Sequence, residues 1–584
     1  MNKDNIIKLT LISFVTMLIL TILGVTYAYF TLDIEGTPKD IVMSSGDLRL
    51  EYKDETELKL DGAFPGDTIT KVITVTNIGT MNASYSLYLG NLINTIEKNE
   101  LSISLDCKSY TNYNETTKAE SGTCNGGKKV IPVSEAASSM TIKDGISIEP
   151  NITQEYTVTI TFKETKKEQN YNKNKKFSGQ IGIGESTLPE PVYCTFDGDL
   201  TQSVEYVNGQ YTYRYKQENS FGGFWQNIDV DGWGVMLSDK SSSDPITGQI
   251  CTYINNKPVV SAHHMFYQSK ATAIDVSNFN TSNITNMGGM FYGSQATSIN
   301  VSNLDTTNVT DMSEMFSYTT NLQNLDVSNF DTSKVTNMSE MFVYSQAKTL
   351  NVSNFDTSNV TNMSSMFSGT QVTTLDVSNF NTSKVTNMNS MFSGTRVTTL
   401  DVSGFDTSNV TNMSSMFETS QIKLIDLSNF NTSNVTDMSR MFYQSNITNL
   451  NLTNFNTSKV SNMSSMFYNS QATTIDLSSF DTSNVTYMSE MFSYCLATIL
   501  DISSFDTSNV TSMTKMFYSC PNLDKIFVGN SFVTDAVTSS DSMFYLSTSL
   551  IGGAGTVYDS TMTDKTYARI DGGTTSPGYF TLKS

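Results

Sequence analysis

The sequence predicts a multidomain protein: an antiparallel β-sandwich followed by a capped solenoid whose 25-residue coils each contain a short strand and a short helix. Two observations lead to this fold. One sequence motif recurs every 25 residues through the second half of the chain. In an earlier region, apolar and polar residues alternate in segments that are separated by turn-forming residues. We therefore divide the chain into five parts, at residues 1–28, 29–187, 188–262, 263–524 and 525–584.

Residues 1–28 carry the features of an export signal. Lys3 and Lys8 precede an apolar run from residue 9 to residue 25, and Thr26-Tyr27-Ala28 fits the small-residue pattern of signal-peptidase sites. Cleavage after Ala28 is one interpretation. An uncleaved membrane anchor is the other, because the run is near the shortest length that spans a bilayer. In both cases we expect an extracellular or cell-surface protein, which meets the membrane only through this segment if the segment is not cleaved.

Charge and composition exclude several classes of function. The chain has 57 acidic and 36 basic residues, a formal net charge of −21, and thus no electrostatic basis for binding nucleic acid. Its only histidines are His263 and His264. The sequence therefore does not favour a catalytic Ser-His or Cys-His pair or a His-rich zinc site. We expect no enzyme activity and no catalytic residues; a secreted peptidase is a remote alternative.

Residues 29–187 are expected to form the β-sandwich. Apolar and polar residues alternate from residue 71 to 76 and from residue 156 to 162, and Gly, Asn and Lys separate such segments, as in antiparallel sheets. The Lys-rich stretch from Lys163 to Lys176 is interpreted as a solvated hairpin tip, with a basic contact site as the alternative. Strand exchange through Tyr29 to Gly36 could join the sandwiches of different copies.

Two segments are expected to cover the ends of the repeat array, because an end coil exposes an apolar face. Residues 188–262 begin with Pro189 and Pro191, which mark a linker, and contain both tryptophans. Residues 525–584 would form the opposite cap.

The array itself contains ten copies of the repeat. Its first methionine recurs at steps of 25 residues, with one step of 26, at Met287, Met312, Met338, Met363, Met388, Met413, Met438, Met463, Met488 and Met513. In one copy Leu350 and Val352 alternate with Asn351, which predicts a short strand with one buried face. The apolar residues between Val360 and Phe367 have helical spacing and follow side chains that can cap a helix, which predicts one or two helical turns.

Six cysteines are compatible with an oxidising compartment. Proximity in the sequence suggests three pairs: Cys107 with Cys124, Cys194 with Cys251, and Cys495 with Cys520. The last two occupy the same position of consecutive coils, where tight stacking brings Cα atoms to about 5 Å, within the range for a disulfide. Two small buried thiols are the alternative for this pair.

Two columns of side chains are candidate binding surfaces. The outward residue of each strand is acidic in seven coils, at Asp275, Asp326, Asp376, Asp401, Asp426, Asp476 and Asp501. Carboxylates in a file favour a polar or cationic partner and could hold calcium; alternatively, they only keep the sheet face soluble. The second column follows the Met-Phe pair and contains Tyr292, Tyr318, Tyr344, Tyr443, Tyr468, Tyr494 and Tyr518. Its rings are either adhesive contacts or packing at the corner of the coil.

The repeats resemble those of the BspA-type leucine-rich-repeat surface proteins of bacteria. The resemblance rests on the run from Asp376 to Met388 and on the Met-Phe pair that follows, and it extends to residues 552–556, 567–571 and 577–581. It implies a leucine-rich-repeat-like solenoid with an adhesive role toward an extracellular protein or glycan, but it identifies no ligand site.

The region from residue 29 to 187 is similar to the camelysin and TasA group of secreted β-sandwich proteins. This similarity rests on residues 26–31, 64–67 and 75–79, and it implies a specialised signal peptidase and participation in matrix fibres. The peptidase activity ascribed to camelysin does not carry over, because residues 1–262 contain no His and the chain has no His-Glu-x-x-His motif.

We therefore expect a non-enzymatic bacterial surface or secreted repeat protein. Its polar ladder would bind host, matrix or neighbouring cells by multivalent contact along the rod. A structural component of an extracellular fibre, self-associating through the sandwich, is the alternative.

Overall fold

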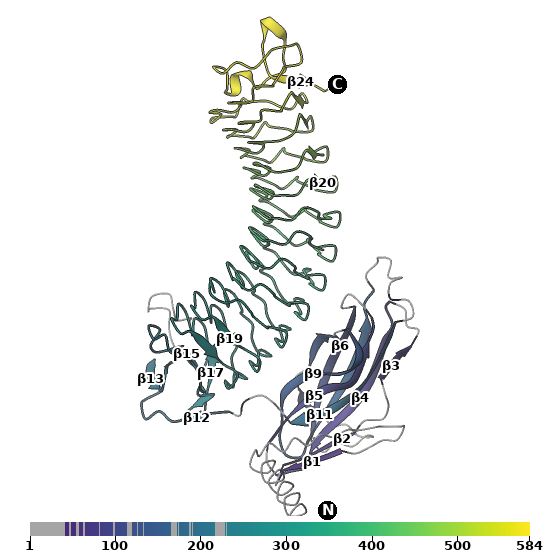
Figure 1. Cartoon of the computed structure of the whole chain (residues 1–584), viewed down its shortest axis with the longest axis vertical. Helices are drawn as coiled ribbons and strands as arrows, with labels where there is room; N and C mark the ends of the chain where they lie inside the picture. The colour runs from purple at the N-terminus through teal and green to yellow at the C-terminus, as the bar shows by residue number, and fades with distance from the viewer. Residues whose placement is uncertain are drawn as a thin grey trace, which may run out of the picture.

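The computed structural model describes residues 41–583 apart from residues 46–47, 54–57, 62–64, 81, 97–99, 112, 114–119, 125, 132, 165–171, 173–174, 186–188, 190, 202, 217–227 and 229. The predicted export signal and the segment from Tyr29 to Gly36 lie outside the described residues. In the described part of the chain no helix has the length and apolar character needed to cross a bilayer. Figure 1 shows a sandwich of long strands beside a curved rod of stacked coils, which ends in a small C-terminal cap.

Two antiparallel sheets build the sandwich. The larger has the order β1-β2-β4-β10-β6-β7, with β8 paired to β6, and the smaller has the order β3-β11-β5-β9. Their strands are β1 (Ile41–Ser45), β2 (Leu48–Lys53), β3 (Leu58–Asp61), β4 (Thr68–Asn77), β5 (Ala83–Asn94), β6 (Leu101–Thr111), β7 (Glu120–Thr123), β8 (Gly127–Val130), β9 (Ser134–Ile148), β10 (Ile152–Phe162) and β11 (Lys176–Glu185). Ile73 of β4, Val158 of β10 and Leu87 of β5 share one core. The residues that alternate in the sequence thus face the space between the sheets.

A six-stranded sheet joins the sandwich to the rod. Its order is β12 (Tyr193–Cys194), β16 (Tyr253–Ile254), β17 (Lys257–Ser261), β15 (Trp233–Leu237), β14 (Tyr211–Tyr215) and β13 (Val204–Asn208). Trp233 is fully buried against Phe196 and Tyr215. One apolar core runs from this sheet into the rod, so the sheet covers the apolar end of the first coil.

The rod is a continuous stack of coils held in register by parallel pairing. Backbone bridges join equivalent residues of successive coils at Ser261, Asn286, Asp311, Asn337, Asn362, Asn387, Asn412, Asp437, Asn462, Tyr487, Ser512 and Ser539. Short strands add further pairing at β18 (Ala273–Asp275), β19 (Ser298–Asn300), β20 (Asn449–Leu450), β21 (Thr474–Ile475), β22 (Ile499–Ile502) and β23 (Lys525–Val528). The predicted inward residues Leu350 and Val352 are buried, and Asn351 is exposed.

Phenylalanine rings form the axis of this stack. Neighbouring centroids lie 5.3–6.0 Å apart along a column made of Phe266, Phe291, Phe316, Phe342, Phe367, Phe392, Phe417, Phe442, Phe467, Phe492, Phe517 and Phe544. The column therefore continues one coil beyond each end of the ten predicted copies.

The predicted helix in each coil is wrong, because the described residues form no α-helix. Two residues per coil adopt left-handed backbone angles, such as Ser365 (φ 55°) and Gly369 (φ 66°), and a right-handed helix cannot pass through them. The Phe367 N–H instead donates to the Met391 carbonyl of the next coil, at 3.0 Å. Apolar residues at helical spacing are thus buried by successive tight turns, and the backbone hydrogen bonds run along the rod.

The C-terminal cap is organised around one carboxylate. β24 (Phe580–Leu582) pairs with β23, and two short 3-10 helices, η2 (Lys565–Tyr567) and η3 (Gly573–Thr575), precede it. Asp571 accepts the Thr556 hydroxyl at 2.6 Å and the backbone N–H groups of Ala554, Thr556 and Gly573 at 2.8–3.0 Å. Burial raises the pKa of the Asp571 carboxyl, but these hydrogen bonds outweigh burial and lower the pKa to about 2.

Candidate functional site

The acidic column stands at a corner where the backbone turns. In ten coils its Asp or Asn side chain accepts the backbone N–H two residues later, as between Asp476 and Ser478 at 3.0 Å. The same turn recurs at two other corners, for example at Asp481 with Ser483 and at Asn462 with Ser464. Asp and Asn recur because they close these turns. This structural role favours the plainer interpretation of the column over a ligand site.

The predicted ladder residues all reach solvent. They are exposed or half-buried at Asp275, Asp326, Asp376, Asp401, Asp426, Asp476 and Asp501. Nowhere in the described parts of the chain do three His, Cys, Asp or Glu side chains gather so that they could hold a metal ion. Calcium binding by this column stays a prediction.

The second column forms two stacks of tyrosine rings. The first stack has centroid separations of 5.1–5.4 Å and runs through Tyr267, Tyr292, Tyr318 and Tyr344. The second has separations of 4.5–5.7 Å and runs through Tyr443, Tyr468, Tyr494, Tyr518 and Tyr545. Sequence reasoning missed Tyr267 and Tyr545, although each follows a Met-Phe pair in an end coil as the others do.

Several of these rings are partly exposed at the surface of the rod. Tyr344 is 50% exposed and Tyr318 is 39% exposed, while each ring covers part of the face of its neighbour. Burial, with the neighbouring Tyr443, raises the pKa of Tyr468 to about 12, so its hydroxyl remains a hydrogen-bond donor at neutral pH. The Arg440 guanidinium lies 3.9 Å from the Tyr443 ring centroid and begins the second stack.

Small residues separate the two stacks. The ring of Tyr344 lies over Gly369, where a Cβ atom would come within 2.4 Å of the ring. Gly394 and Thr419 continue this position in the next two coils. The aromatic edge therefore consists of two separate patches on one side of the rod.

The cysteines follow the predicted pairs in two cases and not in the third. The structure joins Cys107 to Cys124 and Cys194 to Cys251, with Cα atoms 5.0 and 5.8 Å apart. Cys495 and Cys520 are free and buried, so the third predicted disulfide is wrong and the alternative of two buried thiols holds.

The free thiols occupy a position that carries a hydroxyl in most other coils. Cys520 Sγ lies 3.0 Å from the Phe492 carbonyl oxygen and accepts the Cys495 N–H at 3.3 Å. Thr370 at the equivalent position donates its hydroxyl to the Phe367 carbonyl at 3.0 Å. The Cys520 sulfur therefore contacts the backbone of the preceding coil.

The two histidines extend the aromatic edge toward the six-stranded sheet. Their ring centroids lie 4.0 Å apart, and His264 packs edge-on against Tyr267 at 4.9 Å. Burial lowers the pKa of His263 despite the opposing effect of Asp311, so this ring is neutral at pH 7.

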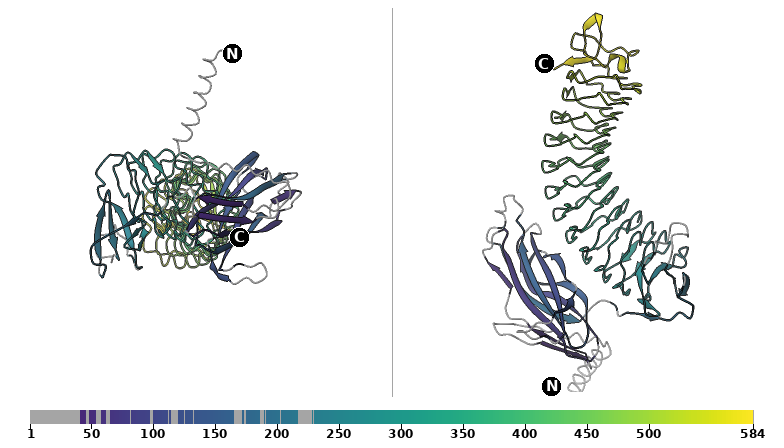
Figure 2. Two further views of the ribbon diagram at one scale, coloured as in Figure 1. Left: turned by 90° about the horizontal axis from the view of Figure 1, so that it is seen from below. Right: turned by 180° about the vertical axis from the view of Figure 1, so that it is seen from behind.

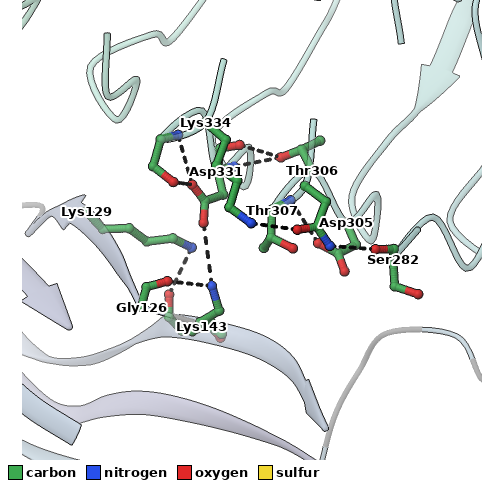
Figure 3. Close-up of polar contacts among 12 residues, drawn as sticks. Gly126, Lys129, Lys143, Ser282, Asp305, Thr306, Thr307, Asp331 and Lys334 are labelled. Carbon is green, nitrogen blue, oxygen red and sulfur yellow. Dashed lines mark hydrogen bonds and ion pairs between the residues drawn. The ribbon is translucent and has the colours of Figure 1, made fainter. Parts of the chain in front are cut away.

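A contact between the sandwich and the rod is a feature that sequence reasoning missed. Lys143 Nζ of β9 lies 3.7 Å from Asp331 Oδ2 of the rod and donates to the Gly126 carbonyl at 2.7 Å (Figure 3). Lys163 Nζ donates to the Ser378 carbonyl at 3.4 Å. At Lys163 the structure therefore favours the alternative of a basic contact site over a solvated hairpin tip.

Comparison with known families identifies the repeats. A family model described as "Mycoplasma protein of unknown function, DUF285" matches residues 260–374, 343–455, 370–479 and 444–553. These overlapping matches span residues 260–553, half of the chain. The chain belongs to the DUF285 family. The DUF285 match indicates a bacterial surface-type repeat protein and assigns it no activity.

The remaining comparisons add no further relative. Searches of curated proteins and of solved structures returned no significant match. The DUF285 matches do not reach residues 29–187, so the similarity of that region to the camelysin and TasA group stays a prediction.

Proposed function

We propose that this protein is a non-enzymatic bacterial surface or secreted protein whose rod binds an extracellular protein or glycan along the two tyrosine stacks. The observation that carries this proposal is the regular spacing of partly exposed rings, one per coil, within each stack. Tyr combines an apolar body with a polar tip, which suits it to binding surfaces. The acidic column is a weaker candidate because its side chains close turns.

Stacking prepares the rings for binding. A ring that already packs against neighbouring rings loses little conformational freedom when a partner arrives, so less binding free energy is spent on ordering it. Each coil then contributes a weak contact, and contacts along a stack act together on an extended partner. Because the ring faces are partly covered, the partner meets ring edges and hydroxyls.

Replacing the exposed rings tests this proposal. Tyr318→Asn, Tyr344→Asn and Tyr494→Asn, combined in one full-length protein, should weaken binding to the best target of a glycan and matrix-protein screen by about tenfold or more. These three residues have φ of 51–58°, and Asn469 already occupies the same position with φ 46°, so Asn suits the backbone.

Tyr487→Asn is the matched control. Tyr487 is 52% exposed but belongs to neither stack; it lies at the corner that carries Asn462 in the preceding coil. Its replacement should leave binding unchanged. Equal binding by the triple variant and the unaltered protein would exclude the stacks as the binding surface.

A structural role in a fibre is the second candidate. Among the described strands, β1 and β3 each pair on one side only, at the ends of the two sandwich sheets. An end strand can accept a strand from another copy. Electron microscopy of the purified protein separates the candidates: filaments would favour the fibre role, and monomers under all conditions tested would exclude it.

A further inference from the structure

The contact between sandwich and rod is made by lysines on one side and by a repeated turn on the other. Figures 1 and 2 show the sandwich beside the N-terminal half of the rod, and two cavities between them are lined by both partners. Lys128 and Lys129 come from β8, Lys143 from β9, and Lys163 follows β10. The rod presents the second Asp or Asn position of its coils, at Asp305, Asp331 and Asp356.

An ion pair crosses this contact. The Lys143 and Asp331 side chains retain only 7% and 15% of their exposure. Burial lowers the pKa of Lys143, and Asp331 and Asp305 oppose that effect. A buried ion pair returns little net stability because both charges lose water, so this pair alone does not hold the contact permanently closed.

The surfaces of the sandwich and the rod are incompletely packed against each other, which also favours a contact that can open. The two cavities have volumes of about 170 Å³ and 420 Å³, and Lys129, Lys143 and Asp331 line the smaller one. Polar contacts between domains of one chain resemble transient interfaces between proteins. The sandwich should therefore leave the rod and return.

The rod surface that the sandwich covers is not unique to one coil. The same turn recurs past the cavities at Asp481 and Asp506, where it closes on Ser483 and Ser508. A lysine-bearing edge that fits this surface within one chain also fits it between chains, and exchange of identical domains is a low-cost route to assembly.

We propose that the sandwich is an exchangeable clasp: its lysine edge closes on the Asp305, Asp331 and Asp356 surface of its own rod, or on the same surface of a second copy. Closed, the chain is a compact monomer. Open, the chain exposes both surfaces and joins a neighbour through the contact that Figure 3 shows within one chain. The proposal does not depend on the tyrosine stacks.

Charge reversal in the full-length protein tests the clasp. Lys143→Glu and Asp331→Lys, made separately, each place like charges at the contact and should shift the radius of gyration in small-angle X-ray scattering to a larger value. Asp331→Lys also removes the turn hydrogen bond to Ser333, so Asp481→Lys, which removes the equivalent bond to Ser483 outside the contact, is its control. Lys176→Glu, at an exposed position of β11, is the control for the sandwich. Both controls should keep the compact profile.

Mixing the two variants tests exchange. The sandwich of the Lys143→Glu chain and the rod of the Asp331→Lys chain carry opposite charges, so an equimolar mixture should form dimers in sedimentation velocity while each variant alone stays monomeric. A mixture that stays monomeric would overturn exchange.

A salt titration tests the clasp in the unaltered protein, so it does not depend on whether a variant folds. Screening over about 10 Å at 0.1 M salt and about 3 Å at 1 M should enlarge the radius of gyration as salt rises. A constant radius across that range, or an unchanged profile for both charge reversals, would refute the clasp.

Discussion

The rod and the sandwich are both built from β-structure, but they connect the chain in different ways. In the rod a residue contacts its equivalent one coil away, as Phe392 contacts Phe417. In the sandwich β3 pairs with β11, so that Leu60 lies opposite Phe177, and β4 pairs with β10, so that strands distant in the sequence depend on one another. Stability of the rod is therefore a sum over neighbouring coils, whereas the sandwich should fold as one unit. Damage should stay local in the first region and spread through the second.

Removing one axial ring should give the largest effect and the clearest contrast. Phe417→Ala leaves a cavity between two ring neighbours and should cost about 3–5 kcal/mol in the free energy of unfolding of the rod, with the sandwich transition unchanged. Phe177→Ala, at a fully buried position, should instead abolish the sandwich transition and spare the rod. Denaturant unfolding, monitored by hydrogen exchange of the backbone amides, measures the transitions of the two regions separately. A single shared transition in both variants would contradict the comparison.

The pH dependence of stability tests whether damage in the C-terminal cap stays local. The pKa of Asp571 is about 2 in the folded chain and about 3.9 in an unfolded one, so its stabilising effect is complete above about pH 4 and is lost as pH falls through 2. Asp571→Asn should destabilise the cap by about 1.5–3 kcal/mol at pH 7 and flatten this acid dependence. Thermal melts from pH 7 to pH 2 measure it. If the stability of the variant fell as steeply with falling pH as that of the unaltered chain, carboxyl groups other than Asp571 would govern the acid dependence.

Replacing Thr407, which links neighbouring coils, should lower the free energy of unfolding by a comparable or smaller amount. Thr407 is fully buried; its hydroxyl donates to the Asn431 carbonyl at 3.0 Å and accepts the Asn431 N–H at 2.8 Å. Thr407→Val keeps the shape but leaves that N–H and carbonyl without these bonds, at about 1–3 kcal/mol. Hydrogen exchange should rise in the coils on either side only. The exposed Thr398 provides the control Thr398→Val, which should be neutral.

The smallest effect is expected at the free thiols. Alkylation of the unreduced, denatured protein should label Cys495 and Cys520 and leave the other four cysteines unlabelled. Cys520→Ser should change the free energy of unfolding by less than about 1 kcal/mol, because neighbouring coils carry a hydroxyl at that position. Loss of labelling at both residues would restore the disulfide that we predicted from spacing.

Periodicity explains which features were predictable. The period, the buried faces and the register of the rod follow from residues such as Met363 and Val360, both fully buried, because a repeated apolar pattern has one way to stack. The helical spacing of the same residues misled us, since a left-handed residue such as Ser365 leaves no mark in a hydrophobic pattern. The contact of Lys143 with Asp331 joins segments with no shared pattern, so composition alone could not reveal it.

The three turns in each coil have a consequence for how the molecule changes over generations. Because every coil passes the same hydrogen bonds to the next, adding or removing a whole 25-residue unit leaves each remaining junction chemically alike and both caps intact. Gain or loss of whole repeats would lengthen or shorten the rod in steps of one coil. The length of the rod is then a heritable quantity set by copy number, and the bridges that span the 26-residue step from Asp311 to Asn337 and the 27-residue step from Ser512 to Ser539 show that a coil also accommodates one or two extra residues.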